Sequence, residues 1–339
     1  MGSTPLALFV GMPGLELSAD ELAFFREANP FGLFLFRRNL DNPEQVRRLC
    51  AQFRKAVGRE DAPVFIDQEG GRVQRLNNGQ WPSFRSLGDF GALARKDLEL
   101  GKRAMRLSTQ AMATLMADLT IDSGTTPVAD LARKGTHDVI GNRAFGDDPD
   151  LVITMAREVI DAMLECGEVP VIKHIPGYGR VTVDPHFDCP VVDATREDLR
   201  DTDFRPFIVL KDAPWAMVAH LVFTQIDPDR PASISPLVCD LIRRDIVYDG
   251  VIITDCLTMG ALKAWPERVT AALDAGYDIA LHSQGDLAAS EAAARAARPL
   301  NEKSLARIAR AQSMRGTRRS DIAALHAEVE QIFRENGIA

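Results

Sequence analysis

The stretch Val251-Ile252-Ile253-Thr254-Asp255-Cys256 shows the pattern on which the whole chain is built. Three β-branched apolar residues predict a short buried strand, and a carboxylate follows almost at once. Seven other short apolar runs alternate with longer stretches of helical spacing: Ala7–Val10, Gly32–Phe36, Val64–Ile66, Thr125–Val128, Val169–Ile172, Ala216–Ala219 and Asp278–Leu281. Strands without a polar face that alternate with helices are typical of a parallel sheet. Eight such units predict an α/β fold, a single-domain (β/α)8 TIM barrel over residues 1–339.

Capping residues mark several of the helices between these strands. Ser18, with Glu21 three residues later, has the spacing of a capping box. Pro43 can open the next helix, and Gly276 can end a later one at its C-cap. Helical spacing covers Lys96–Ala117, Pro149–Cys166, Thr195–Lys211, Pro236–Arg244, Pro266–Ala275 and about Ser320–Asn336.

Composition and charge argue against several classes of function. The net charge of −8 disfavours nucleic-acid binding, which needs a clustered basic surface. The N-terminal sequence MGSTPLALFVGMPG lacks the basic region of a signal peptide, and no apolar run approaches the roughly 18 residues of a membrane span. The 5 cysteines are scattered and form no CxxC pair, which predicts reduced thiols in a cytoplasm and no zinc site or disulfide framework.

Polar residues follow the predicted strands, where the reactive groups of a barrel lie. Burying unpaired charge costs several kcal/mol, so core packing does not easily explain them. Asp255 could attack an anomeric carbon and form a glycosyl-enzyme, although a strand-end Asp more often caps the next helix. Asp184 and His186 project to one side of an extended chain. His186, oriented by Asp184, could exchange a proton with the leaving oxygen and then with water. The alternative is a surface loop with an incidental histidine.

Other strand-end residues suit sugar binding. A carboxylate such as Asp67 accepts hydrogen bonds from a vicinal diol, while Arg75 and Arg143 donate in a fixed fork. The pair Gly70-Gly71 allows a sharp turn and a close approach to a ligand. For Arg75, salt bridging across the barrel rim is the alternative.

Alternative interpretations stay open for four further residues. Lys173 and His174 can donate hydrogen bonds to sugar hydroxyls, but Lys173 could also form a Schiff base with a carbonyl substrate or a structural ion pair. His220 either lines the pocket or satisfies a backbone group. For Arg72, salt bridging across the rim is a credible alternative to ligand binding.

In their order and spacing these motifs resemble glycoside hydrolase family three, and specifically its short bacterial β-N-acetylhexosaminidases. The resemblance covers nearly the whole chain. The segments that carry it are Gly32–Asn39, Asp67–Arg75, Pro127–Asp130, Ile140–Gly146, Lys173–Gly177, Asp184 with His186, Met217–His220 and Thr254-Asp255. Longer family members carry a second domain that supplies a carboxylate acid, so in this chain the proton donor is expected from the barrel.

The resemblance implies a role for each candidate. The matching positions are Asp255 as nucleophile, His186 as acid/base with Asp184 as its partner, and Asp67, Arg75, Arg143, Lys173 and His174 as residues that hold N-acetylglucosamine. It also implies a cytoplasmic enzyme of cell-wall recycling that acts on N-acetylglucosaminyl-1,6-anhydro-N-acetylmuramyl peptides without a metal or cofactor. We expect no nucleic-acid or membrane partner, and a monomer.

Three residues depart from the family pattern. Tyr178 stands where His is common, Pro185 where Ser is common, and Cys256 where a second Asp is usual. These departures keep other hypotheses open: a sugar-binding barrel with impaired catalysis, a relative that cleaves β-glucosides or works by phosphorolysis, and a Schiff-base lyase that uses Lys173.

Overall fold

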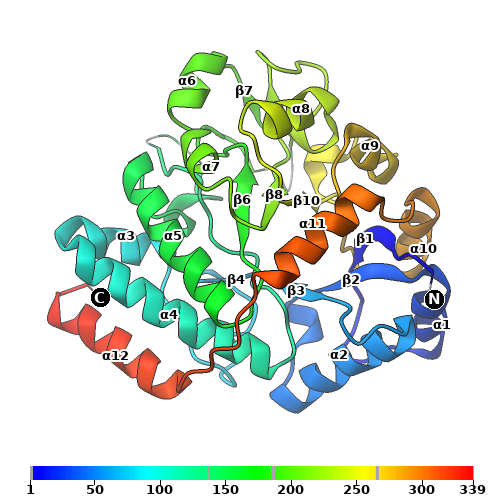
Figure 1. Ribbon diagram of the computed structural model, residues 1–339, viewed down its shortest axis with the longest axis horizontal. Helices are drawn as coiled ribbons and strands as arrows, with labels where there is room; N and C mark the ends of the chain where they lie inside the picture. The colour runs from blue at the N-terminus through cyan, green and yellow to red at the C-terminus, as the bar shows by residue number, and fades with distance from the viewer. Residues whose placement is uncertain (1–2, 134, 136, 185–187, 265–266, 339) are drawn as a thin grey trace.

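A computed structural model of the chain describes residues 3–133, 135, 137–184, 188–264 and 267–338. One parallel sheet curls in the centre, with helices around its outside (Figure 1). Neighbouring strands follow the order β3-β2-β1-β11-β10-β8-β6. Their bounds are β1 Leu6–Val10, β2 Pro30–Leu35, β3 Val64–Ile66, β6 Val171–Ile175, β8 Trp215–Val218, β10 Val251–Cys256 and β11 Ile279–His282. Parallel strands that alternate with helices confirm the predicted α/β barrel class.

Residues 122–129 lie between β3 and β6, where the eighth strand of the barrel is expected. Isolated bridges join Ser123 to β3 and Val128 to β6. Thr125 has a φ of 44°, and Pro127 has no N–H to donate, so a continuous ladder cannot form. The prediction of a regular strand here is therefore wrong, although the segment hydrogen-bonds to both neighbours and closes the ring.

Aromatic side chains fill part of the barrel interior. The rings of Phe9 and Phe65 lie 4.7 Å apart, and Phe65 contacts Trp215 with ring centroids 5.4 Å apart. Because β8, which carries Trp215, is not a neighbour of β3, this contact crosses the interior. A Cβ on Gly32 would lie 2.2 Å from the Phe9 ring, so only glycine leaves room for it. The barrel is a packed core that leaves space for a ligand at its end.

The α-helices cover the outside of the sheet. Two groups of helices lie on opposite sides of the barrel: one contains α3, α4, α5 and α12, and the other contains α1, α2 and α10 (Figure 1). Their bounds are α1 Ala19–Ala28, α2 Pro43–Val57, α3 Leu87–Lys96, α4 Leu98–Asp118, α5 Pro149–Glu165, α6 Arg196–Asp201, α7 Arg205–Val209, α8 Pro236–Arg244, α9 Arg268–Ala275, α10 Leu287–Ala296, α11 Glu302–Ser313 and α12 Ile322–Glu335. Short 3-10 helices are η1 Arg37–Asn39, η2 Gly141–Arg143, η3 Ala232–Ile234 and η4 Gly260–Leu262.

The three predicted helix-end signals are confirmed. Ser18 forms the capping box with Glu21, Pro43 opens α2, and Gly276 ends α9 in the left-handed conformation. The single helix predicted over Thr195–Lys211 is wrong, because the segment breaks into α6 and α7. The break falls at Thr202, whose φ of −126° and ψ of −90° are not helical, and Pro206 stands in the first turn of α7, where a missing N–H is tolerated. Helices α3, α10 and α11 were not predicted.

Two small ribbons extend the barrel strands. β4 Gln68–Gly70 and β5 Val73–Gln74 form an antiparallel hairpin after β3, while β7 Val191–Val192 pairs with β9 Val222–Phe223. The hairpin turns at Gly70 and Gly71, with φ of 93° and 58°. A Cβ on Gly70 would lie 2.3 Å from the carbonyl oxygen of Arg85. The predicted sharp turn at Gly70-Gly71 is confirmed.

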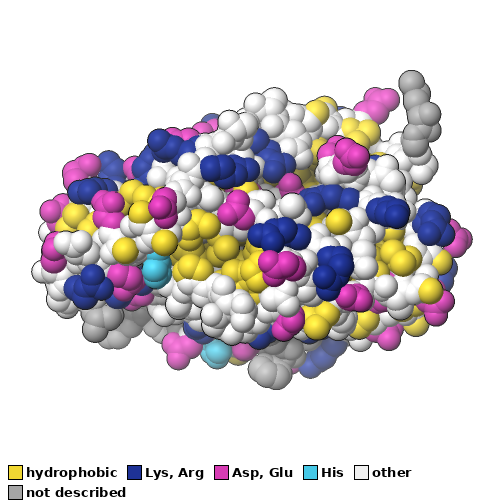
Figure 2. Space-filling view, turned by 90° about the horizontal axis from the view of Figure 1, so that it is seen from below, with side chains coloured by type: hydrophobic (Ala, Val, Ile, Leu, Met, Phe, Trp, Pro, Cys, Tyr) yellow, Lys and Arg dark blue, Asp and Glu magenta, His cyan; other side chains and the backbone are white. Residues whose placement is uncertain are grey.

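Charges of both signs share the molecular surface. Figure 2 shows Lys and Arg side chains dispersed among Asp and Glu on one face, with small groups of apolar side chains between them. Within the described part of the chain, no helix combines the length and the apolar content that crossing a membrane requires.

Candidate active site

A cavity of about 370 Å³ opens where the barrel strands end. Seven predicted site residues line it: Asp67, Arg75, Arg143, Lys173, His174, Asp184 and Asp255. The eighth, His186, lies outside the described residues, as does Pro185. The fold therefore brings together side chains that are up to 188 residues apart in the chain, the separation of Asp67 from Asp255.

Lys173 is buried in the wall of this cavity between two carboxylates. Its Nζ lies 3.2 Å from Asp67 Oδ1 and 2.6 Å from Glu69 Oε1, and it donates to Thr125 Oγ1 at 3.1 Å. The Lys173 side chain is 1% exposed, and the contacts account for all three of its N–H groups. This geometry supports the structural ion pair among the alternatives for Lys173, because its Nζ is enclosed by two carboxylates and a hydroxyl.

Glu69 is a buried carboxylate beside Lys173, and it was not among the predicted site residues. Arg143 Nε and Nη2 bind its two oxygens in a fork, each at 2.8 Å. Burial alone would raise the pKa of Glu69, but Arg143 and then Lys173 outweigh it and hold that pKa at about 2. Glu69 stands two residues after Asp67, a spacing that places both on one side of an extended chain and could have revealed it.

Asp67 is held by charges from two directions. Its Oδ2 accepts from Arg75 Nη2 at 2.9 Å, and its Oδ1 accepts from Thr125 Oγ1 at 2.8 Å. Burial opposes ionisation, yet Lys173 and Arg75 keep the pKa of Asp67 well below its ordinary value. Arg75 Nε is buried and has no hydrogen-bond partner among the described residues. Asp67 is thus an ionised acceptor at the cavity wall.

His174 is oriented by Asp130, which follows residues 122–129, the segment that closes the barrel. The Asp130 carboxylate lies 2.7 Å from His174 Nδ1, and it also accepts the backbone N–H groups of His174 and Tyr178. Because a carboxylate can only accept, Nδ1 carries the proton and Nε2 is directed toward Arg143, 3.5 Å away. Asp130 belongs to the segment Pro127–Asp130 that carries the family resemblance, but it was not predicted to orient this imidazole.

Asp255 ends β10 at the cavity mouth. Its Oδ1 accepts the N–H of Cys256 at 2.6 Å. The next helix, η4, has Met259 at its N-cap and no capping side chain, so the helix-cap interpretation of Asp255 is wrong for that helix. His220 donates to the carbonyl oxygen of Cys256 over 2.9 Å and lies 2.7 Å from Ser233 Oγ. Burial lowers the pKa of His220, and this neutral imidazole satisfies a backbone group behind Asp255.

Two further residues, Asp184 and Arg72, also line the cavity. Asp184 is half-buried and lines the same cavity as Asp255. Arg72 donates to the carbonyl oxygen of Ile140 at 3.0 Å and to Asn142 Oδ1 at 3.1 Å. Among the described residues Arg72 binds neutral acceptors, so a salt bridge across the rim is not its role.

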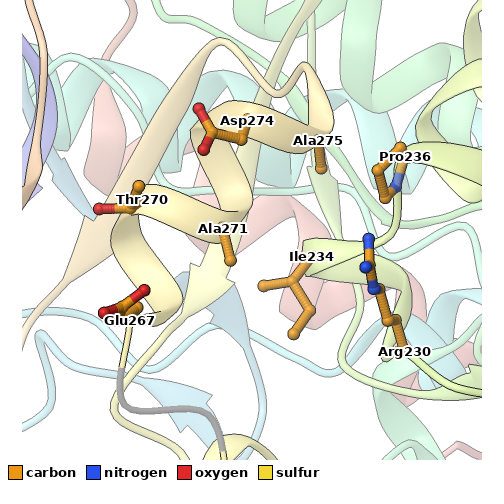
Figure 3. Close-up of a pocket in the computed structure, with 8 residues that line it drawn as sticks. All are labelled: Arg230, Ile234, Pro236, Glu267, Thr270, Ala271, Asp274 and Ala275. Carbon is orange, nitrogen blue, oxygen red and sulfur yellow. The ribbon is translucent and has the colours of Figure 1, made fainter.

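A second cavity, of about 380 Å³, lies outside the barrel along α9 (Figure 3). Ala271 and Ala275 face Ile234 and Pro236 across it, while Thr270 points away. Asp274, on its rim, already pairs with Arg298 at 2.6 Å. Because it lacks the convergent buried charges found at the strand ends, we place the active site in the first cavity.

No cluster of three or more His, Cys, Asp or Glu side chains in the described ranges could hold a metal ion.

Acidification is expected to weaken the fold through this charge network. Glu69 has an ordinary pKa of 4.5 and a folded pKa of about 2. A lowered folded pKa contributes stability that is complete above the unfolded value and is lost as pH falls toward the folded one. The free energy of unfolding should therefore decline from about pH 4.5 toward pH 2. Urea titrations across this range measure it, and a Glu69→Gln variant with an unchanged slope would contradict the assignment.

Comparisons with known proteins cover this barrel and its cavity. Residues 11–313 match the family model of the glycosyl hydrolase family 3 N terminal domain. A beta-hexosaminidase of Xanthomonas campestris pv. campestris (strain B100) is 35% identical over 303 residues, which span 88% of this chain and 90% of the relative. The structure of NagZ from Neisseria gonorrhoeae in complex with N-trifluoroacetyl-D-glucosamine has a TM-score of 0.86 and 28% identity over 98% of this chain and 99% of that one. A family 3 beta-N-acetylglucosaminidase from Paenibacillus sp. str. FPU-7 has a TM-score of 0.85 and 26% identity over 96% of this chain and 67% of that one.

Proposed function

Because the chain belongs to glycosyl hydrolase family 3 and is a β-N-acetylhexosaminidase, we propose that it is a retaining exo-enzyme whose nucleophile is Asp255. The observation that carries this proposal is the position of Asp255, at the end of a barrel strand and in one cavity with ionised, hydrogen-bonded carboxylates and arginines. A terminal N-acetylglucosamine unit presents hydroxyl and amide groups that such a wall can bind.

The proposed reaction is a double displacement. A carboxylate oxygen of Asp255 forms a bond to the anomeric carbon while the glycosidic bond breaks, and His186 gives its proton to the leaving oxygen. Water then attacks the glycosyl-enzyme, His186 takes one proton from that water, and Asp255 leaves as a carboxylate. Asp184 holds the imidazole of His186 in the required tautomer. A histidine acid avoids a second anion opposite the nucleophile, and it becomes neutral once its proton is given.

The sugar is held by the charge network. In the proposed complex, Asp67 accepts hydrogen bonds from sugar hydroxyls, and Arg75 and Arg143 donate to sugar oxygens. His174 presents Nε2 to the sugar because Asp130 occupies its other nitrogen. Lys173 acts by holding Asp67 and Glu69 ionised between it and the two arginines.

We place the substrate among cell-wall muropeptides, with release of N-acetylglucosamine in the cytoplasm by a monomeric enzyme. The NagZ structure in complex with N-trifluoroacetyl-D-glucosamine supports a glycone of this class. Turnover of a muropeptide beside a simple N-acetyl-β-glucosaminide tests the leaving group, and a β-glucoside tests the glycone. Added phosphate that yields the sugar 1-phosphate would instead favour phosphorolysis.

The acid/base assignment predicts how activity depends on the leaving group. Replacing His186 with alanine should lower kcat/KM for a disaccharide substrate by about 10³-fold, since general acid catalysis contributes on that order. For a 2,4-dinitrophenyl glycoside, whose leaving group needs no proton, the loss of kcat/KM should be much smaller. Azide, which needs no base, should restore kcat and give the β-glycosyl azide.

A matched control and the contrary outcome are available. His326 lies on α12, where its ring packs against Phe84, and it lies outside the cavity lining. A His326→Ala variant should keep the wild-type kcat/KM for both leaving groups. Equal losses for both leaving groups in His186→Ala would remove this residue from proton transfer. Binding of N-acetylglucosamine without turnover by the wild-type protein would favour the impaired-catalysis alternative.

A further inference from the structure

Tyr178 follows β6 and lines the cavity together with Asp255 and His174. The centroid of its ring lies 5.6 Å from that of His174, and the residue is 4% exposed. Its hydroxyl is buried and has no hydrogen-bond partner among the residues that the structure describes. Buried hydroxyls nearly always have a partner, so an unpaired one beside an active site requires an explanation.

The backbone around Tyr178 is tied down at three successive positions. The N–H of Tyr178 donates to Asp130 Oδ1 at 2.8 Å. A Cβ on Gly177 would lie 2.6 Å from the carbonyl oxygen of Asp203, and a Cβ on Gly179 would lie 2.7 Å from Asp203 Oδ1. Asp203 is itself buried and accepts from Arg180 Nε at 2.7 Å. The backbone is therefore held closely at these positions, and the ring that it carries is almost completely buried.

The surroundings keep this hydroxyl protonated. Burial raises the pKa of the Tyr178 phenol, and the negative charges of Asp255 and then Asp130 raise it further. A neutral phenol among carboxylates remains a donor over the whole range in which an enzyme works. A fixed donor of this kind suits a neutral acceptor oxygen such as those of a sugar or its acetamido group.

We propose that the Tyr178 hydroxyl is a further substrate-binding group, which donates a hydrogen bond to an oxygen of the N-acetylglucosaminyl unit bound over Asp255. This inference rests on the proposed function, since it takes Asp255 to mark the position of the sugar. The hydroxyl, which has no partner among the described residues, gains one when the sugar binds, so the donor is in place before the ligand arrives.

A Tyr178→Phe variant tests the proposal, because it removes only the hydroxyl. We expect kcat/KM for p-nitrophenyl N-acetyl-β-glucosaminide to fall by about 10- to 100-fold, the loss caused when a sugar oxygen is left without its donor. The dissociation constant of N-acetylglucosamine, measured by calorimetry without turnover, should rise by a similar factor. The Tm should not fall, since the folded free enzyme loses no hydrogen bond.

Tyr248 offers a matched control. It is buried, as Tyr178 is, but its hydroxyl donates to the carbonyl oxygen of Ala213 at 3.0 Å, and it lies outside the cavity lining. Tyr248→Phe should therefore lower the Tm and leave kcat/KM and N-acetylglucosamine affinity at the wild-type values. The two substitutions make the same chemical change with opposite expected readouts.

Other outcomes separate this inference from the proposed function. A Tyr178→Phe variant with wild-type kcat/KM and sugar affinity would overturn the role of Tyr178, even if Asp255→Ala is inactive. A lowered Tm with intact affinity would overturn it too, by assigning the hydroxyl to the fold. Full activity of Asp255→Ala would instead remove the nucleophile, while a calorimetric loss of affinity in Tyr178→Phe would still support the contact with the sugar.

Discussion

Replacing Asp255 with alanine is expected to lower kcat for an aryl N-acetyl-β-glucosaminide by about 10⁴-fold, a loss typical of a missing nucleophile. In the proposed mechanism this carboxylate forms the bond to the anomeric carbon. Asp255 is only partly buried, and its recorded hydrogen bond joins the adjacent N–H of Cys256, so the Tm should change little. Steady-state kinetics and thermal unfolding of the same preparation measure both effects.

The configuration of the product formed with azide provides a second test of Asp255 as the nucleophile. The small side chain leaves room beside the anomeric carbon, so azide should restore turnover and attack from the vacated side. The product would be the α-glycosyl azide, of opposite configuration to that expected for His186→Ala. Asp255→Asn, which keeps the volume, should be inactive and respond less to azide. Equal sugar release by Asp255→Ala and the wild-type protein would remove Asp255 from the mechanism.

Replacing Lys173 with methionine is expected to cost the largest amount of stability. Methionine keeps the aliphatic stem but leaves the half-buried carboxylate of Asp67 and the buried carboxylate of Glu69 without their shared cation. Removing one partner of a buried ion pair typically costs 3–5 kcal/mol, and we expect about 3 kcal/mol because Arg75 and Arg143 still neutralise one carboxylate each. Urea unfolding should show a lower midpoint with an unchanged m-value.

A double variant provides the control for Lys173. Adding Glu69→Gln completes a double-mutant cycle: the loss of stability in Lys173→Met/Glu69→Gln should be smaller than the sum of the losses in the two single variants, because both remove the same Lys173–Glu69 contact. Strictly additive losses would show that Glu69 is not coupled to the lysine. Treatment of the wild-type protein with a carbonyl compound and borohydride should leave Lys173 unlabelled. A stable adduct there would revive the Schiff-base hypothesis.

The sequence determines the alternation of strands and helices in this protein. A run of β-branched apolar residues such as Val251–Ile253 favours a buried strand. The polar residues that follow such a run then lie at the strand end. Capping signals such as Ser18 with Glu21 act within a few residues, so they too are readable in advance. For the same reason the sequence alone predicts that Asp67, Lys173 and Asp255 lie together at one end of the barrel, as they do.

Only the tertiary structure decided which of these groups meet. Residues 122–129 replace a regular strand by bonding to neighbours far away in the chain, and no local pattern encodes that choice. Through packing of distant segments, Glu69 became the shared partner of Arg143 and Lys173, and the Tyr178 hydroxyl was left without a partner among the described residues. Periodicity and spacing report the conformation of a few neighbouring residues. Hydrogen-bond partners and desolvation depend on which distant atoms come within about 3 Å, and folding alone establishes that.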